Sequence, residues 1–463
     1  MFSSKTYSER RKKLTELTGS GIILLLGNEE SPMNYLDNAY SFRQDSTFLY
    51  YFGIDQPGLT GIIDIDEKKE IIFGNELTVE EIVWMGVQKT IAEKALLAGV
   101  QETKPLEELP RLLAEAIHKG RKIHFIPQYR AENILELSQL LGLNSLRINE
   151  YASPVLMKAV IEQRSVKSDE EIKQIESALL VSYQMYKAAY KVTRPGILEK
   201  DISGMMEGIA LAIGNGLSFP TIFSMFGEIL HNHYHGNIME EGRLIVCDSG
   251  SESELHYASD ITRTFPVSGK FTDIQKTVYQ IVLNANLAGI AAVKPGLKFR
   301  EVHLLASKTI AEGLKDLGLL KGNIEDIVSS GAHALFFVHG IGHMLGLDVH
   351  DMENFGEVNT GYSDTIQRSQ QFGLNALRYG KELRTGNVMT IEPGIYFIPQ
   401  LIEKWESENI LTDFINYDKV KEYIGFGGIR VEDDVLVTET GSRVLGKPIP
   451  KTIEDIENAM AAK

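Results

Sequence analysis

Four carboxylates in the second half of the chain lie inside or beside apolar runs that have the composition of β-strands. A carboxylate in such a run is costly to bury unless it is paired or binds a cation. Together the four carry a charge of −4, which two divalent cations would balance. These residues are Asp248, Asp260, Glu392 and Glu432, beside or within the runs 244–247, 261–265, 388–391 and 428–434.

One imidazole accompanies these carboxylates, that of His343 in the sequence 339–343. Oxygen-rich ligation with one nitrogen favours Mn²⁺, and Co²⁺, Zn²⁺ or Fe²⁺ are also compatible. Two such ions bridged by carboxylates activate a water at neutral pH and polarise a scissile carbonyl. Taken singly, each carboxylate could be a cap, a turn or a surface residue, and His343 could be a hydrogen-bonded core histidine. The hypothesis of a dinuclear hydrolytic site therefore depends on the whole set.

Composition limits the classes of function. The chain has 463 residues, 43% of them apolar and 24% charged, which predicts a globular protein of two domains. Its net charge of −16 argues against nucleic acid as a partner, because phosphate binding depends on Lys and Arg. Most of this acidity is expected to favour solubility.

The cellular environment is predicted from the single cysteine and the N-terminal region. Cys247 excludes an intrachain disulfide and fits a reducing compartment, and its apolar neighbours indicate a small buried residue, not a nucleophile. No apolar stretch is long enough for a signal peptide or a spanning helix, since the run 21–26 is too short. We therefore expect a cytoplasmic protein with no membrane partner.

The first third of the chain has the alternation of an α/β domain. The run 21–27 predicts a buried strand after a helix at 7–18. The remaining elements expected here are strands at 48–52, 61–65 and 70–73 and helices at 79–98 and 106–118.

A domain boundary is expected at 164–171, where Ser168 and Glu171 form a capping-box pattern. This gives domains at 1–165 and 166–463. Beyond it, two helix pairs each precede a strand-rich stretch, which predicts a pseudo-symmetric α+β domain with its site between the sheet halves. The helices are expected at 168–192, 198–213, 272–292 and 299–316, and the strand-rich stretches at 240–267 and 386–438.

The whole chain resembles the aminopeptidase P and prolidase group of the pita-bread metallopeptidases. The segment 42–53 is similar to the start of the family's N-terminal domain. The resemblance implies an α/β creatinase/prolidase-like N-terminal domain and an α+β pita-bread catalytic domain. The blocks that carry the catalytic part are 260–272, 339–343, 345–351, 390–396 and 429–434.

The family pattern also implies a role for each site residue. Asp248 would bind one metal, His343 and Glu392 the other, and Asp260 and Glu432 would bridge them. Glu392 would also shuttle a proton. The implied substrate histidines are His231, His339 and His350, which would bind the peptide and stabilise developing charge; His233, His235 and His256 match no family site and are expected at the surface or rim.

Arg430 precedes Glu432 by two residues, so on a strand both side chains share a face. We expect Arg430 to hold a ligand carboxylate in place. Asp248 and Asp260 are 12 residues apart, one more than the family usually has. A longer loop or a bulge between them would account for the difference.

The length of the substrate is suggested by Arg378. An insert separates His350 from Glu392, and its end at 373–378 resembles eukaryotic-type prolidase, as do the 40-residue spacing from Glu392 to Glu432 and the run 423–428. The matching arginine in prolidase grips the carboxylate of a C-terminal proline, a task that suits guanidinium. Arg378 could instead form only a surface pair or cap.

The resemblance implies a metal-dependent peptidase for the Xaa-Pro bond. We expect an Xaa-Pro dipeptidase acting on proline-containing peptides, with an Xaa-Pro aminopeptidase for longer peptides as the alternative. Some proteins of this fold have lost their metals and act as binding modules, but this chain keeps the full ligand set. The N-terminal domain implies a homodimer or homotetramer, in which Trp84 either reaches a neighbouring subunit's site or packs in its own core.

Overall fold

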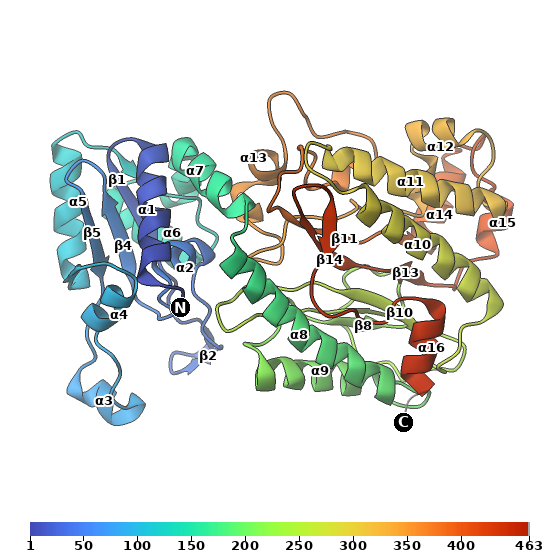
Figure 1. Cartoon of the computed structure of the whole chain (residues 1–463), viewed down its shortest axis with the longest axis horizontal. Coiled ribbons are helices and arrows are strands. Elements are labelled where there is room, and N and C mark those ends of the chain that lie inside the picture. Colours follow the sequence, from blue (N-terminus) through green and yellow to red (C-terminus); the bar gives the residue numbers. More distant parts are fainter. Residues whose placement is uncertain (462–463) are drawn as a thin grey trace. The chain divides into compact units, whose positions relative to one another are not determined.

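The structure, a computed structural model that describes residues 1–461, consists of two compact units (Figure 1). The first contains residues 1–164 and 352–356, and the second contains residues 165–351 and those from 357 onward. Among the described residues, no helix has the length and apolar character needed to cross a membrane.

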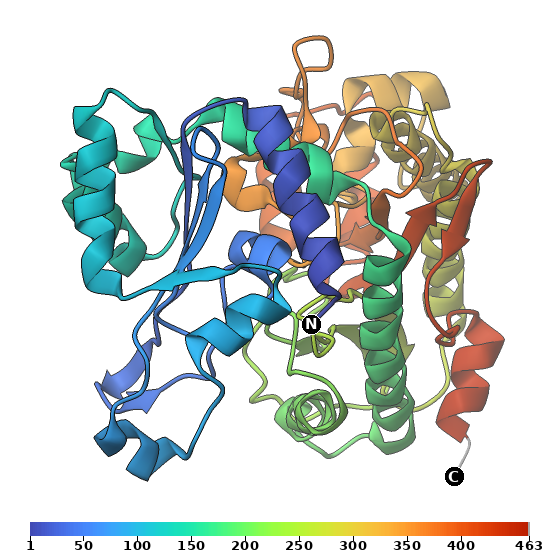
Figure 2. The ribbon, with the colours of Figure 1, turned by 60° about the vertical axis from the view of Figure 1, so that its left-hand side comes forward.

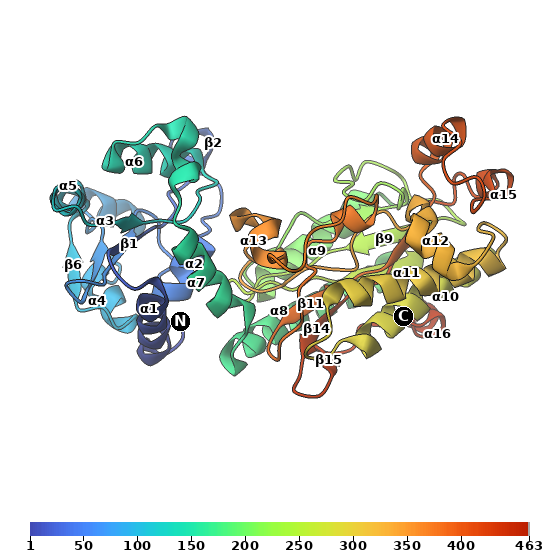
Figure 3. The same cartoon turned by 90° about the horizontal axis from the view of Figure 1, so that it is seen from above.

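The first unit is built on a five-stranded sheet of order β6–β5–β4–β1–β7. Helices α5 and α6 lie on one face of this sheet and α1 on the other (Figures 2 and 3). Strand β1 is buried along its whole length because both of its faces are covered, which explains its continuous apolar run. The bounds are β1 (Ile22–Leu26), β4 (Thr60–Asp64), β5 (Lys69–Phe73), β6 (Glu102–Lys104), β7 (Ile123–His124), α1 (Ser4–Thr18), α5 (Leu109–His118) and α6 (Ala131–Leu141).

The strand predicted at 48–52 is wrong, because this segment is helix α2 (Ser46–Phe52). The Asp45 carboxylate accepts hydrogen bonds from the amides of Thr47 and Phe48, both at 2.9 Å, and so caps the helix. Gly53 ends it in a left-handed conformation. A short run that is buried on every side has no periodicity to reveal, so only these caps distinguish helix from strand.

The single helix predicted at 79–98 is instead two, α3 (Val79–Met85) and α4 (Ile91–Leu97). Each begins with its own capping box, Thr78 with Glu81 and Thr90 with Glu93. Trp84 on α3 is 86% exposed, so the expectation that it packs in its own core is wrong.

The second unit contains two helix pairs, and each pair precedes one half of the strands, as expected: α8 and α9 precede the half-sheet β10–β9–β8, and α10 and α11 precede the half-sheet formed by β11–β14–β15 and β12–β13. Helix α8 packs against α9, and α10 against α11 (Figure 3). The capping box of Ser168 and Glu171 is present at the start of α8. The helices are α8 (Asp169–Val192), α9 (Glu199–Ile213), α10 (Asp273–Ala292) and α11 (Phe299–Asp316); the strands are β8 (Ile222–Ser224), β9 (Leu244–Asp248), β10 (Thr262–Pro266), β11 (Val388–Ile391), β12 (Gly394–Tyr396), β13 (Gly428–Arg430), β14 (Asp433–Val437) and β15 (Ser442–Val444).

Hydrogen bonds join the strands of the two half-sheets where the predicted ligands lie. The amide of Glu432 donates to the carbonyl of Thr262 at 3.0 Å, and the hydroxyl of Thr264 donates to the carbonyl of Arg430 at 3.0 Å. These bonds attach the chain around Glu432 to strand β10, which begins two residues after Asp260. Two segments far apart in the sequence thus meet at the site.

The hairpin between β9 and β10 is longer than expected for the family but regular. Asp248 pairs with Thr262, and the same register continues to the tip, where the amide of Ser253 donates to the carbonyl of Tyr257 at 2.9 Å. The extra residue is therefore accommodated by a longer loop, not by a bulge. Because the pairing is regular and the spacing even, Asp248 and Asp260 project from the same face of the sheet.

Two histidines of the second unit are buried as neutral groups. His303 on α11 is 1% exposed, and burial lowers its pKa to about 3. Burial likewise lowers the pKa of His333 to about 4. In the unfolded chain a histidine has a pKa of about 6.5, so unfolding at mildly acidic pH takes up protons.

Acidification below about pH 6.5 should therefore reduce the free energy of unfolding through these residues, by about 1.4 kcal/mol per pH unit for each. Urea unfolding from pH 7 to 5 would measure this effect. His303→Leu should have a smaller pH slope than the wild type, whereas His118→Leu at an exposed position should keep the wild-type slope. Equal slopes for all three proteins would contradict the assignment.

Candidate metal centre and substrate cavity

A cavity of about 320 Å³ in the second unit contains every site residue predicted from the sequence. Its walls come from both half-sheets and from the segment 339–350 between them. Apolar side chains, including Phe219, Ile222 and Val349, line the rest of the cavity. The predicted residues that it brings together are His231, Asp248, Asp260, His339, His343, His350, Arg378, Glu392, Arg430 and Glu432.

The predicted ligands form a compact cluster. Ligand atoms of Asp260, His343 and Glu432 all lie within 4.8 Å of one another. The Nε2 atom of His343 is 3.3 Å from Oδ2 of Asp260 and 3.6 Å from Oε1 of Glu392. Asp260 before β10, His343, Glu392 in the loop after β11 and Glu432 before β14 therefore converge on one volume.

His343 is oriented for coordination. Its Nδ1 lies 3.0 Å from the main-chain carbonyl of Met344, which can only accept, so Nδ1 carries the proton. Nε2 therefore presents its lone pair to the carboxylates. Metal-binding histidines have this tautomer and this kind of carbonyl contact.

The charges of the cluster fit a cation. Asp248, Asp260 and Glu432 are buried, and Glu392 is partly buried. Burial, followed by the repulsion of the neighbouring carboxylates, raises the pKa of Asp260 and of Glu432 well above its usual range. Within residues 1–461, Oδ1 of Asp248 and Oδ1 of Asp260 are buried and have no hydrogen-bond partner. Divalent cations would satisfy these oxygens and relieve the repulsion, so the donor set fits two metal ions.

Arg430 forms an ion pair with one of the predicted ligands. Its Nη2 donates to Oδ2 of Asp248 at 2.5 Å. Its Nε donates to the hydroxyl of Thr262, which in turn donates to Oε2 of Glu432 at 2.7 Å. One guanidinium therefore orients carboxylates of both half-sheets.

Tyr396 connects this arginine to His339. The hydroxyl of Tyr396 accepts from Nη1 of Arg430 at 2.9 Å and lies 2.8 Å from Nε2 of His339. Nδ1 of His339 lies 2.8 Å from the carbonyl of Gly340 and must carry the proton, so Tyr396 donates to Nε2. Burial, followed by the charge of Arg430, lowers the pKa of His339 to about 3. His339 is therefore neutral, with both nitrogens engaged.

The other histidines occupy different environments. His231 and His350 line the cavity, and His233 lies at its exposed rim. His235 is half-buried and 3.2 Å from the hydroxyl of Ser203. The expectation that His256 lies at the surface is wrong, because it is 3% exposed and its Nδ1 contacts the Glu252 carboxylate at 2.5 Å.

Arg378 lies in the cavity wall and also forms an ion pair. Its Nη1 is 3.1 Å from Oε1 of Glu357, whose other oxygen is 2.7 Å from Nη1 of Arg368. Arg368 does not line the cavity. Arg378 therefore both pairs with a carboxylate and lines the cavity.

Two residues of the site were not assigned a role from the sequence. Tyr396 lies in the matched block 390–396, but only the pairing of β12 with β13 brings it beside Arg430. Asp434, which is fully buried, accepts a hydrogen bond from the amide of Asp260 at 3.1 Å. Neither contact has a signal in local sequence, because each joins segments that are far apart in the chain.

Comparison with known proteins gives the family. The model of Metallopeptidase family M24 matches residues 173–439, and that of the Aminopeptidase P, N-terminal domain matches residues 7–124. The chain belongs to metallopeptidase family M24. It has the two-domain architecture of aminopeptidase P structures, an α/β N-terminal domain followed by a pita-bread catalytic domain.

Individual relatives extend over the whole chain. Human Xaa-Pro dipeptidase is 30% identical and covers 98% of this chain and 91% of its own. A probable Xaa-Pro aminopeptidase of Colletotrichum graminicola is 31% identical and covers 96% and 93%. The structure of Pseudomonas aeruginosa aminopeptidase matches with a TM-score of 0.81 at 27% identity, covering 100% of this chain and 98% of that chain.

Divalent metal should stabilise the protein, because it binds the folded ligand set and relieves the repulsion within it. At 100-fold excess over its dissociation constant, Mn²⁺ should add about 2.7 kcal/mol per site. Thermal unfolding with Mn²⁺ and with a chelator would measure this. Asp260→Ala should abolish the Mn²⁺-dependent rise in Tm, whereas Asp273→Ala at the exposed start of α10 should preserve it.

Proposed function

We propose that the protein is an Xaa-Pro dipeptidase that uses two divalent metal ions, with Mn²⁺ favoured. The coarser function, a metal-dependent Xaa-Pro peptidase, follows from the family and from relatives that match the full length. The observation that favours a dipeptidase is the position of Arg378 in the wall of the cavity.

We assign the metal ligands by the family pattern and the cluster geometry. Asp248 would bind one ion, His343 and Glu392 the other, and Asp260 and Glu432 would bridge them. When bound, such a pair of ions activates a water nucleophile and polarises the scissile carbonyl. Oxygen donors with a single imidazole support Mn²⁺ among the divalent ions.

The remaining groups divide the work of binding and proton transfer. Burial raises the pKa of Glu392, so this carboxylate is suited to take a proton from the attacking water and deliver it to the leaving proline nitrogen. His231 and His350 line the cavity and are assigned to the peptide. Both nitrogens of His339 already contact protein groups, so a direct substrate contact would require one of those bonds to open.

Arg378 would bind the carboxylate of a C-terminal proline. Guanidinium recognises carboxylate through two parallel hydrogen bonds, and a wall of the cavity is where the end of a short substrate would lie. Its ion pair with Glu357 at 3.1 Å would hold the guanidinium in place before the substrate binds. A clamp of this kind directly after proline would exclude longer peptides.

The alternative is an Xaa-Pro aminopeptidase. The relatives named Xaa-Pro dipeptidase and those named Xaa-Pro aminopeptidase are about equally similar, at 30% and 31% identity. Sequence identity therefore favours neither function. The aminopeptidase alternative depends on whether the cavity accepts peptide residues beyond proline.

A series of peptides of increasing length, with Mn²⁺ added, would separate these functions. Ala-Pro should be cleaved, and Arg-Pro-Pro and longer peptides should be poor substrates. In Arg378→Ala, kcat/KM for Ala-Pro should fall by about 10–1,000-fold, because a charge-assisted pair contributes about 1.5–3 kcal/mol and geometry adds to this. Arg368→Ala removes the other partner of Glu357 outside the cavity and should change kcat/KM little.

Two outcomes would contradict the dipeptidase proposal. One is efficient release of the first residue from tri- and pentapeptides by the wild type, which would establish the aminopeptidase function. The other is an Arg378→Ala variant with unchanged dipeptide activity, which would remove the carboxylate clamp.

We further propose that the chain forms a homo-oligomer through its N-terminal unit. Val79, Val83, Trp84, Met85 and Val87 are all exposed large apolar side chains within one short segment around α3. Exposed apolar side chains that are this close together are typical of a surface that contacts another protein.

If this segment is an oligomer contact, Trp84→Asp should shift the molar mass in solution toward the monomer. Light scattering after size-exclusion chromatography would measure this. Leu146→Asp replaces another apolar residue, 93% exposed and distant from this segment in the sequence, and should leave the mass unchanged. A wild-type protein that is already monomeric would refute the oligomer proposal.

A further inference from the structure

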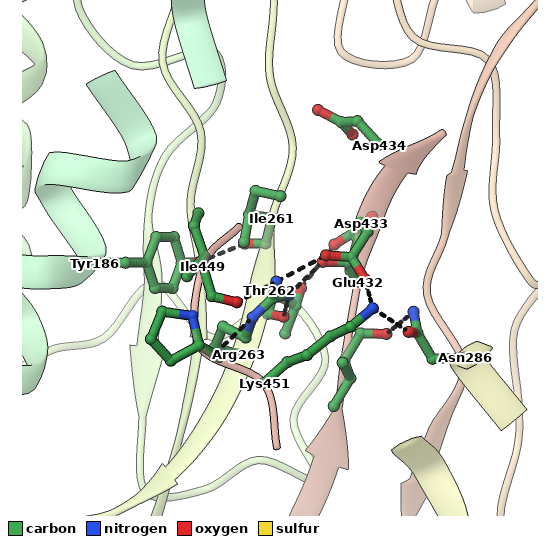
Figure 4. Close-up of polar contacts among 12 residues, drawn as sticks. Tyr186, Ile261, Thr262, Arg263, Asn286, Glu432, Asp433, Asp434, Ile449 and Lys451 are labelled. Carbon is green, nitrogen blue, oxygen red and sulfur yellow. Dashed lines mark hydrogen bonds and ion pairs between the residues drawn. The ribbon is translucent and has the colours of Figure 1, made fainter. Parts of the chain in front are cut away.

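A second polar cluster lies behind the metal centre, between the strands and helices α8 and α10, and centres on Arg263 (Figure 4). This side chain is 1% exposed, and every N–H of its guanidinium has an acceptor. Nη2 donates to Oδ1 of Asp433 at 2.7 Å. The other acceptors are the carbonyls of Thr262 at 2.9 Å, Glu432 at 2.5 Å, Ile449 at 3.2 Å and Pro450 at 3.1 Å.

Lys451 and Asn286 extend this network to a further pair of strands. Nζ of Lys451 donates to Oδ2 of Asp433 at 2.6 Å and to Oδ1 of Asn286 at 3.0 Å. Nδ2 of Asn286 in turn donates to the carbonyls of Ile391 at 2.9 Å and Val431 at 3.3 Å. Ile391 and Val431 directly precede Glu392 and Glu432 in the chain.

Tyr186 on α8 makes the equivalent contacts at the other half-sheet. Its hydroxyl is 3.1 Å from the carbonyl of Cys247 and also contacts the carbonyl of Ile261. Cys247 precedes Asp248, and Ile261 follows Asp260. Each of the four carboxylate ligands thus has a main-chain carbonyl, its own or its neighbour's, held by a buried polar side chain.

The alternation of side chains along a strand explains this arrangement. Thr262 and Glu432 face the cavity, so their neighbours Arg263 and Asp433 point to the opposite side. The predicted ligand Glu432 and the network residue Asp433 are therefore neighbours in the chain, and their side chains point to opposite sides. A shift of the main chain at the support would displace the ligand by a similar distance.

The segment 449–451, near the end of the described chain, is part of this support. It supplies the carbonyls of Ile449 and Pro450 and the ammonium of Lys451. Two tyrosines hold the segment in place, Tyr190 by a bond to the carbonyl of Pro450 at 2.9 Å and Tyr279 by a bond to the carbonyl of Lys451 at 2.8 Å.

We propose that Arg263, Asp433, Lys451, Asn286 and Tyr186 are positioning residues of the metal centre, and that the segment 449–451 thereby helps to set its metal affinity. This inference rests on the proposed dinuclear site. Buried ion pairs contribute little net stability compared with well-packed apolar groups. A network that fixes the geometry of several ligands has a function that apolar packing would not supply.

Lys451→Met tests this proposal, because it removes the ammonium but keeps an unbranched side chain. Titration of the metal-free full-length protein with Mn²⁺, followed by the EPR signal of free Mn²⁺, should show affinity reduced by about 10–100-fold. At saturating Mn²⁺ the variant should recover most of its kcat, because all ligands remain. Lys451→Arg, which keeps a cation beside Asp433, should restore part of the affinity.

Lys447→Met is the matched control. It makes the same substitution in the same part of the chain, but Lys447 is exposed and lies 4.0 Å from the centre of the Tyr183 ring, without contact to the network. Its Mn²⁺ affinity should equal that of the wild type. Wild-type affinity in Lys451→Met, or an equal loss in both variants, would overturn the proposal.

A second pair of variants keeps the test decisive if Lys451→Met does not fold. Tyr186→Phe removes the hydroxyl that holds Cys247 and Ile261 and should also weaken Mn²⁺ binding. Tyr417→Phe removes a hydroxyl bonded to the carbonyl of Ile410 at 2.6 Å, away from any ligand, and should not. If Tyr186→Phe and Tyr417→Phe bind Mn²⁺ with equal affinity, the positioning role is refuted. A wild-type protein that binds no Mn²⁺ would instead refute the metal centre itself.

Discussion

The mutual repulsion of four carboxylates in one small volume is the constraint on which the catalytic unit depends. Three of them are buried, and burial together with the charge of neighbouring carboxylates raises the pKa of Asp260 and of Glu432. A fold that gathers such a set without cations incurs a cost that no nearby apolar packing offsets. The surrounding structure is consistent with a site that divalent ions neutralise, in a chain whose family is defined by metal-dependent peptidases.

Holding this cluster requires groups on both sides of the strands. On the cavity side, Arg430 pairs with Asp248, and Thr262 connects the guanidinium to Glu432. On the opposite side, Arg263 and Asn286 bind the main chain of the same strands. The strands can therefore present charged side chains to the cavity and still keep their backbone fixed.

The cavity combines these charges with the neutral imidazole of His339. His339 stays neutral because burial and the charge of Arg430 disfavour its protonation. A neutral ring beside Glu392, at 3.7 Å, leaves that carboxylate available for a proton. Arg378 in the cavity wall is the cation that we propose for a substrate carboxylate.

The sequence by itself predicted the carboxylates and the histidine that line one cavity, the paired helices and the second domain, because charge inside apolar runs, capping residues and helical periodicity are local properties. It did not determine that 48–52 is a helix, because a segment buried on all sides has no periodic pattern. Only the tertiary structure decided that Asp248 and Asp260 share a face, that Tyr396 joins Arg430 to His339, and that residues 449–451 lie behind the ligands. These features depend on strand pairing and on contacts between residues distant in the sequence, such as Thr262 with Glu432, and no local pattern encodes them.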